Sequence, residues 1–178
     1  MERKGDFIKT HSGINFYPLD PRPEEILIED IAHALSNLCR FTGHCPEFYS
    51  VAQHSAIVSR LVKPQYALHA LLHDASEAYI CDIARPVKRE PEMKPYLDIE
   101  RVLQAAIYRK FGLDENEPGD VKYVDTRILV TEACMFNMLA EDCALYDVER
   151  FDIAITPAEP KIAKQLFIDR FHELVSEE

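Results

Sequence analysis

The sequence predicts an all-α protein that forms a single compact bundle, preceded by a short extended arm. Apolar residues recur at three- and four-residue steps in most segments between prolines and glycines, which is the period of helices that pack through one face. The length of 178 residues fits one domain of ordinary size. No segment has the composition of a flexible linker, so we expect one core and one site.

The arm occupies residues 1–23. Residues 7–17 alternate loosely between apolar and polar around Ser12-Gly13, which favours a short β-hairpin or an extended strand. Prolines at positions 18, 21 and 23 then separate this segment from the first helical pattern. We therefore expect residues 1–23 to pack on the helical domain as an extended arm.

Caps and breakers delimit the expected helices. Ser50 can accept a hydrogen bond from the first turn of the helix that follows it, and Gly112 is placed to end a long helix. Pro118 and Pro160 each precede a helical pattern, while prolines at 86, 91 and 95 mark an irregular stretch. These signals predict helices over about residues 28–40, 51–62, 65–79, 96–111 and 120–139, and a last helix after Pro160.

Composition and charge restrict the function. The formal net charge of −11 repels polyanions, which argues against a nucleic acid polymer as partner. The N-terminus lacks the apolar region of a secretory signal, and no stretch approaches the roughly 18 uninterrupted apolar residues of a membrane span. The five cysteines are scattered and never form Cys-x-x-Cys, so we expect reduced thiols rather than a disulfide framework or a zinc ribbon. We expect a cytoplasmic protein whose partner is a small molecule.

A histidine and a carboxylate stand side by side in the apolar segment Ala-Leu-Leu-His-Asp-Ala-Ser-Glu, residues 70–77. A buried carboxylate costs several kcal/mol unless it is paired or bound to a metal. A cation would satisfy both His73 and Asp74. Adjacent helical side chains diverge by about 100°, so the two converge on one ion only if it lies above the ridge between them. Further ligands must come from other helices.

His54 and Asp125 are the candidates for those ligands. His54 lies in an apolar helical run, and Asp125 borders the buried stripe of a later helix. Each alone is explained more simply as a hydrogen-bonded polar group at the edge of the core. Their combination with His73-Asp74 reverses that preference. His69 has the four-residue spacing to His73 that zinc proteases use, but no Glu follows it, so we expect a structural role.

The order His, His-Asp and a distant Asp resembles the HD-domain superfamily of phosphohydrolases. The segments around these residues are similar to those of bacterial 5'-deoxyribonucleotidases of that superfamily, over about residues 35–138. The resemblance implies an α-helical HD domain with one divalent metal ion. Mixed nitrogen and oxygen ligation suits Mn, Co, Fe, Zn or Mg and does not choose among them. The implied metal ligands are His54, His73, Asp74 and Asp125.

The resemblance also implies a catalytic glutamate. Glu77 stands four residues after His73 and three after Asp74, on the same helix face, at the glutamate position of His-Asp-x-x-Glu. Its implied role, beside Asp74, is to orient or deprotonate the attacking water or to protonate the leaving oxygen. The alternative is a solvated carboxylate on the helix surface.

Substrate contacts are implied at five positions. Arg40-Phe41 matches an Arg followed by an aromatic residue, where Arg contacts phosphate and the ring lies against the sugar. The family usually has Trp there, and this chain has no Trp, so the strictness of sugar discrimination stays open. Asp82 and Lys88 match a loop in which Asp contacts the 3'-hydroxyl and Lys holds phosphate. His44 contributes either a phosphate contact or a loop hydrogen bond.

The sequence thus predicts hydrolysis of a phosphoester on a small nucleotide, with a 2'-deoxyribonucleoside 5'-monophosphate as the expected substrate. One alternative is release of triphosphate from a deoxynucleoside triphosphate. Another is a nucleotide-binding module that keeps the metal without turnover. The relatives also imply a homodimer or a larger homo-oligomer.

Overall fold

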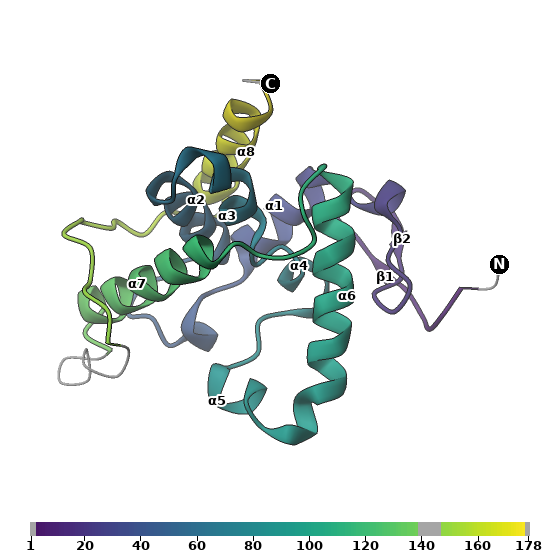
Figure 1. Ribbon diagram of the computed structural model, residues 1–178, viewed down its shortest axis with the longest axis horizontal. Helices are drawn as coiled ribbons and strands as arrows, with labels where there is room; N and C mark the ends of the chain where they lie inside the picture. The colour runs from purple at the N-terminus through teal and green to yellow at the C-terminus, as the bar shows by residue number, and fades with distance from the viewer. Residues whose placement is uncertain (1–2, 139–146, 177–178) are drawn as a thin grey trace.

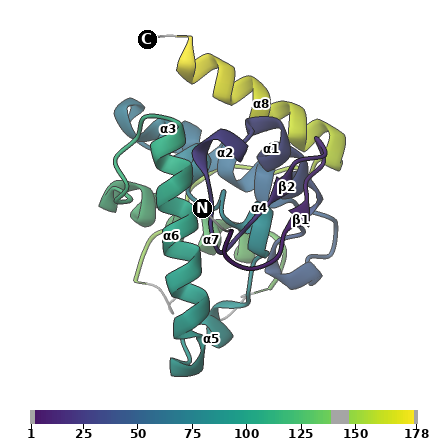
Figure 2. The ribbon, with the colours of Figure 1, turned by 90° about the vertical axis from the view of Figure 1, so that its right-hand side faces the viewer.

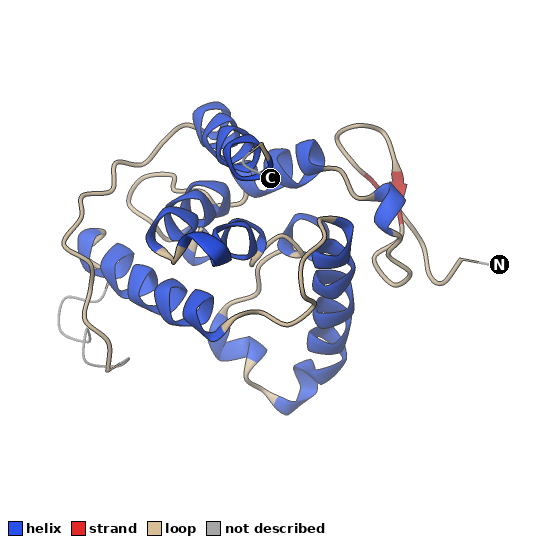
Figure 3. Cartoon of the chain, turned by 45° about the horizontal axis from the view of Figure 1, so that its top comes forward, coloured by secondary structure: helices blue, strands red, loops and turns tan. Residues whose placement is uncertain are grey.

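The computed structural model describes residues 3–138 and 147–176, and helices dominate this part of the chain (Figure 1, Figure 3). The predicted all-α class is confirmed. None of the helices in the described ranges combines the length and the apolar composition that a membrane crossing requires. The helices are α1 (Ile28–Asn37), α2 (Val51–Leu61), α3 (Ala67–Leu72), α4 (Glu77–Ile80), α5 (Arg85–Lys88), α6 (Lys94–Lys110), α7 (Gly119–Met135) and α8 (Pro160–Val175).

A short antiparallel hairpin precedes the helices. Strand β1 (Ile8–Lys9) pairs with β2 (Asn15–Phe16). The backbone nitrogen and the hydroxyl of Ser12, in the connecting turn, donate hydrogen bonds of 2.7 and 2.6 Å to the Asp30 carboxylate on α1. The Phe16 side chain is fully buried in the main core. The hairpin predicted around Ser12-Gly13 is therefore present and is fastened to the first helix.

Helix α2 is central to the packing and contacts α1, α3, α7 and α8. Figure 2 shows α8 lying across α1 and α2 at one end of the molecule. Buried side chains from α1, α2, α3, α6 and α8 and from β2 form the main core, which includes Phe16, Tyr108, Phe167, Leu103 and Leu71. A second apolar cluster joins α2 and α3 to α7 through Val58, Ala70, Val121 and Ile128. Elements distant in sequence are thereby held around α2.

The sequence predicted one continuous helix over residues 65–79, and this prediction is wrong because the structure has two shorter helices there. Helix α3 ends at Leu72 and α4 begins at Glu77. Between them the backbone hydrogen bonds span three residues: Ala75 donates to the Leu72 carbonyl at 3.0 Å and Glu77 to the Asp74 carbonyl at 3.0 Å. This tighter winding interrupts the α-helix. No proline or glycine marks the break, which is why the sequence pattern did not indicate it.

The other helix boundaries agree with the pattern to within a few residues. The Ser50 side chain accepts a hydrogen bond from the Gln53 backbone nitrogen and caps α2 as predicted. Helix α1 ends three residues earlier than expected, because Leu38 turns to an extended conformation and its carbonyl accepts from Val51. Helix α7 ends at Met135, and the predicted end near position 139 lies outside the described residues.

The cysteine prediction holds only in part. Cys39, Cys45 and Cys81 are free thiols, of which the first two are half-buried and the third is exposed. Cys134 on α7 is disulfide-bonded, so the expectation of reduced thiols is wrong at that position.

Candidate metal centre and substrate cavity

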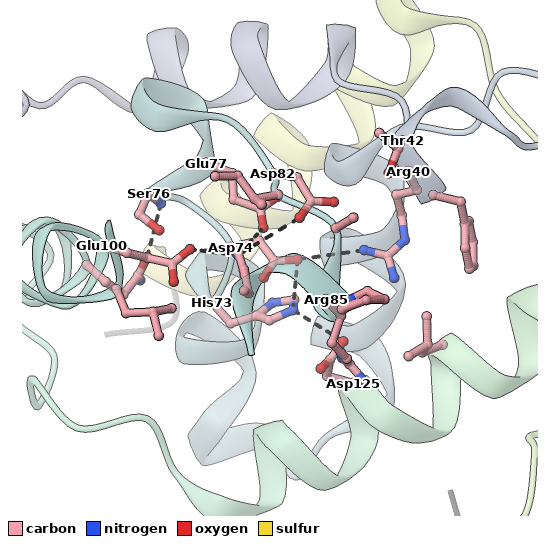
Figure 4. Close-up of a pocket in the computed structure, with 18 of the residues that line it drawn as sticks. Arg40, Thr42, His73, Asp74, Ser76, Glu77, Asp82, Arg85, Glu100 and Asp125 are labelled. Atoms are coloured by element: carbon pink, nitrogen blue, oxygen red, sulfur yellow. Dashed lines mark hydrogen bonds and ion pairs between the residues drawn. The ribbon is translucent and has the colours of Figure 1, made fainter. Parts of the chain in front are cut away.

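The four predicted ligands meet at one place. His54 comes from α2, His73 and Asp74 from the tight turn after α3, and Asp125 from α7. His54 Nε2 lies 3.3 Å from Asp125 Oδ1, and His73 Nε2 lies 3.2 Å from Asp74 Oδ2. The two cross distances, His54 to Asp74 and His73 to Asp125, are each 3.8 Å. Figure 4 shows His73, Asp74 and Asp125 facing one another.

Both histidines direct Nε2 toward this centre. His73 Nδ1 donates to the Ala70 carbonyl at 2.8 Å, and His54 Nδ1 donates to Glu132 Oε1 at 2.7 Å. In the neutral imidazole, this hydrogen bond leaves the lone pair on Nε2. Neither Nε2 has a hydrogen-bond partner in the described chain, although both are buried. Buried polar atoms without partners are rare and costly.

A divalent cation fits these donors. One ligand atom from each of His54, His73 and Asp74 lies within 4.8 Å of the others. Neighbouring ligands about 2.1 Å from one ion are separated by about 3.0–3.4 Å, close to the shorter nitrogen–oxygen distances here. An ion would satisfy the two Nε2 atoms and bring Asp125 into the same group. The residues present are thus suitable for holding a metal.

Both carboxyl groups of the centre are ionised. Burial by itself raises the pKa of Asp74, but the attraction of His73 outweighs it and holds that pKa below its usual range. Burial acts in the same way on Asp125, where the close contacts of His54 and His73 with the carboxylate lower its pKa well below its usual range. Ionised carboxylates and neutral imidazole nitrogens are the forms that bind metals.

His69 stays outside the centre. Its Nε2 lies 3.1 Å from the Asp114 carbonyl, and the ring packs edge-on against Tyr108. This agrees with the structural role expected from the missing protease motif.

The centre forms the floor of a cavity of about 830 Å³. His73, Asp74 and Asp125 line it, while His54 lies beneath and is fully buried. The six other residues predicted to act on the substrate also line this cavity: Arg40, Phe41, His44, Glu77, Asp82 and Lys88. The structure therefore brings every predicted site residue to one place.

Glu77 is not a surface carboxylate. It begins α4, is 6% exposed, and its Oε2 has no hydrogen-bond partner among the described residues. Its Oε1 lies 3.7 Å from Lys88 Nζ. Burial raises the pKa of Glu77 well above its usual range, and the negative charges of Asp74 and Asp82 act in the same direction. Glu77 is thus suited to carry a proton at the edge of the centre.

Lysine and arginine side chains line the cavity together with the carboxylates. Lys88 Nζ donates to Glu100 Oε1 at 2.8 Å and lies 3.9 Å from Asp82 Oδ1. Arg40 Nη1 lies 3.8 Å from Asp74 Oδ2, beside the centre. Arg85, Arg101 and Lys122 also line the cavity. The cavity thus carries positive groups although the net charge of the whole chain is −11.

The segment that carries Arg40 has an unusual backbone. Phe41 and Thr42 adopt φ of +53° and +56°, a region that non-glycine residues seldom occupy. Such conformations cost of order 1–3 kcal/mol each and persist only where the surroundings impose them. Here they place Arg40, Phe41 and His44 on one wall of the cavity.

Lys122 and Glu132, which contact the predicted metal ligands, were not predicted from the sequence. Lys122 Nζ donates to Asp125 Oδ2 at 3.0 Å. Glu132 is fully buried on α7 and accepts from His54 and Arg40. It stands seven residues after Asp125, which is two helical turns on the same face. A glutamate two turns after Asp125, on the buried face of the same helix, was the feature of the sequence that could have indicated Glu132.

These features define a mostly α-helical protein with a buried His/Asp group able to hold a metal ion at the floor of a cavity. No family model matches the chain. It is 40% identical over 175 residues to uncharacterized protein YfdR of Escherichia coli (strain K12), an alignment that covers 94% of this chain and 95% of that protein. It is 32% identical over 166 residues to uncharacterized protein RCAP_rcc00048 of Rhodobacter capsulatus, covering 88% and 83%. The chain belongs to the family of YfdR.

Proposed function

We propose that this chain is a metal-dependent phosphohydrolase of the HD type that acts on nucleotides. One observation carries the proposal: two buried imidazole nitrogens without hydrogen-bond partners in the described chain face two carboxylates at the floor of a cavity that also holds lysine and arginine side chains. The resemblance of His54, His73-Asp74 and Asp125 to the HD ligand set supports it. The expected reaction is release of phosphate from a (2'-deoxy)ribonucleoside 5'-monophosphate.

The metal would be held by His54, His73, Asp74 and Asp125. When bound, a divalent ion polarises a phosphoryl oxygen and lowers the pKa of a coordinated water. Mn, Co, Fe, Zn and Mg are all compatible with two nitrogen and two oxygen donors.

The phosphate group would lie between two cations. Arg40 Nη1 faces the floor of the cavity beside Asp74, and Lys88 Nζ lies on the side that carries Glu77. A phosphate that meets both is oriented with its scissile bond next to Glu77. Such positioning is a large part of catalysis of phosphoryl transfer.

Glu77 would handle the proton. Hydrolysis breaks the bond between phosphorus and O5' and forms a bond from phosphorus to the water oxygen. One hydrogen of the water stays in the new P–OH group and the other returns to Glu77 as a proton, while O5' receives a proton and becomes a hydroxyl. The protonated form of Glu77, favoured by its burial, donates that proton to O5'. Lys88 at 3.7 Å stabilises the carboxylate that remains. Asp74 would take part in catalysis as a ligand of the metal ion.

The sugar would contact Phe41 and Asp82. Both line the cavity. Asp82 accepts a hydrogen bond from the 3'-hydroxyl, and the Phe41 ring lies against the sugar at its 2' position. This arrangement favours a deoxyribose over a ribose.

A substrate screen tests the proposal. Nucleoside mono-, di- and triphosphates are incubated with the protein and each of Mn, Co, Fe, Zn and Mg, and the products are identified. Release of inorganic phosphate from monophosphates supports a 5'-nucleotidase, whereas tripolyphosphate from deoxynucleoside triphosphates indicates a triphosphohydrolase. Tight binding of metal and nucleotide without any product would refute an enzymatic role and leave a binding module.

A further inference from the structure

Glu132 connects the two halves of the site. Its Oε1 accepts hydrogen bonds of 2.7 Å from both His54 Nδ1 and Tyr49 OH. Its Oε2 accepts from Arg40 Nε at 3.0 Å, and Arg40 Nη2 lies 3.0 Å from the same oxygen. The carboxylate is fully buried, so its four acceptor sites are occupied by protein donors alone.

The first consequence concerns the metal. An acceptor at Nδ1 holds the proton of His54 on that nitrogen and directs the lone pair of Nε2 toward Asp74 and Asp125. In metalloproteins such partners of ligating histidines fix the tautomer and the ring orientation. His73 obtains the same fixation from a backbone carbonyl, which no side-chain substitution removes.

The second consequence concerns the anion site. Two of the three nitrogens of the Arg40 guanidinium are bound to Glu132, and Nη1 is the one that lies toward Asp74. Arg40 is itself only 8% exposed, so its direction is set by this pairing rather than by solvent. The planar guanidinium makes the orientation specific.

Charge balance links the two consequences. Asp74 and Asp125 would serve a bound divalent ion, and Asp125 also pairs with Lys122, so the buried Arg40 charge needs a carboxylate of its own. Glu132 supplies that compensation at 3.0 Å. Without it, an unpaired buried guanidinium would stand next to the cation, a costly arrangement.

We propose that Glu132 is a positioning residue that orients both the metal ligand His54 and the anion-binding Arg40, and so couples metal binding to substrate binding. This inference rests on the proposed function and deepens it. Glu132 touches neither the metal nor the substrate in this scheme and acts through the two side chains that do.

Replacing Glu132 by Gln tests the metal side. The amide oxygen is drawn to the two Arg40 donors, so the amide nitrogen faces His54 and donates to Nδ1. The imidazole proton then moves to Nε2 and blocks the ligand atom. We expect the Kd of metal-free protein for Mn²⁺ or Zn²⁺ to rise by about 10- to 100-fold, the usual effect of losing such a partner.

The tautomer itself can be observed. Side-chain ¹⁵N shifts of metal-free wild type should show His54 protonated on Nδ1, and those of Glu132→Gln should show it protonated on Nε2. A loss of stability alone would not move this signal. The matched control is Ser59→Ala, a buried hydroxyl on the same helix that bonds Ala67 and Arg170 far from the cavity. It should lower stability and leave the tautomer and the metal Kd unchanged.

A double variant covers the case in which Glu132→Gln does not fold. Arg40→Met with Glu132→Leu removes both buried charges together, so neither is left unpaired. It should fold, bind metal about 10- to 100-fold more weakly, and lose binding of inorganic phosphate. If wild type binds metal but either folded variant binds it equally tightly, the positioning role is refuted while the phosphohydrolase proposal stands. If wild type binds no divalent ion, both fall.

Discussion

Replacing Glu77 by Gln separates proton transfer from metal binding. Glutamine has the same shape, and the Oε2 atom that becomes an amide group makes no hydrogen bond in the described chain. The single ion-pair distance lost is 3.7 Å to Lys88, which keeps its shorter contact of 2.8 Å to Glu100. The substitution therefore leaves the cavity and the centre intact and removes only an ionisable group.

The expected effect is on turnover. Loss of a positioned acid or base lowers the rate by about 10²- to 10⁴-fold, which is about 2.7–5.5 kcal/mol in the activation free energy. KM should change by less than about threefold, because Glu77 is assigned to the transition state and not to ground-state binding. Metal content should equal that of wild type.

The assay is steady-state release of phosphate from a nucleoside monophosphate at saturating substrate, with elemental analysis of the same sample. Glu100→Gln serves as the comparison, since it removes another carboxylate from Lys88 on α6, away from the centre. It should act mainly on KM, with kcat changed by less than about tenfold. A Glu77→Gln variant that retains its metal and the wild-type kcat would show that Glu77 moves no proton in the reaction.

Three further predictions follow from the site. Asp74→Ala should lose both metal and activity, because a ligand is removed from a small donor set; elemental analysis that still finds one ion per chain contradicts this. Dideoxynucleotides should be poorer substrates than deoxynucleotides by about 5- to 150-fold in kcat/KM, since the Asp82 acceptor loses a partner worth about 1–3 kcal/mol. Asp82→Ala should abolish that difference, and equal kcat/KM values in wild type would show that Asp82 does not contact the sugar. Burial raises the pKa of Glu77 in the folded protein above its unfolded value of about 4.3. The protonated side chain therefore stabilises the fold fully at pH values below the unfolded pKa, and this stabilisation is lost as pH rises through the folded pKa. In urea unfolding of metal-free protein, the free energy of unfolding of Glu77→Gln minus that of wild type should increase as the pH is raised from 4 to 8. A difference that stays constant over this range would show that the pKa of Glu77 is not raised in the folded protein.

The sequence was informative about helices because their apolar period and caps are local. Ser50 caps α2 as its residue type predicts, and the prolines at 118 and 160 stand at the starts of α7 and α8. The break after Leu72 was missed because every residue from 73 to 76 is compatible with a helix. Its cause is tertiary: the turn places His73 and Asp74 against α2 and α7, where their side chains find partners.

Part of the candidate site was predictable because its residues follow the order His, His-Asp and Asp that the sequence shares with the HD superfamily it resembles. His54, His73-Asp74 and Asp125 carry that order. Glu132 was not, because its partner Arg40 lies 92 residues away and no spacing rule connects them. Helix α7 packs against α2 and carries Glu132 to His54, while Arg40 reaches the same carboxylate from the segment between α1 and α2.

The origin of the ligands in three separate segments has a consequence for folding. His54 on α2, the turn after α3, and Asp125 on α7 would be cross-linked by one ion, which closes chain loops in the way that a disulfide does. An ion that binds only the folded state adds about 2.7 kcal/mol of stability when its free concentration is 100 times its Kd. The unfolding temperature of the protein should therefore report metal availability, and chelation should loosen α7 from the rest of the bundle before the main core around α1 and α8 opens.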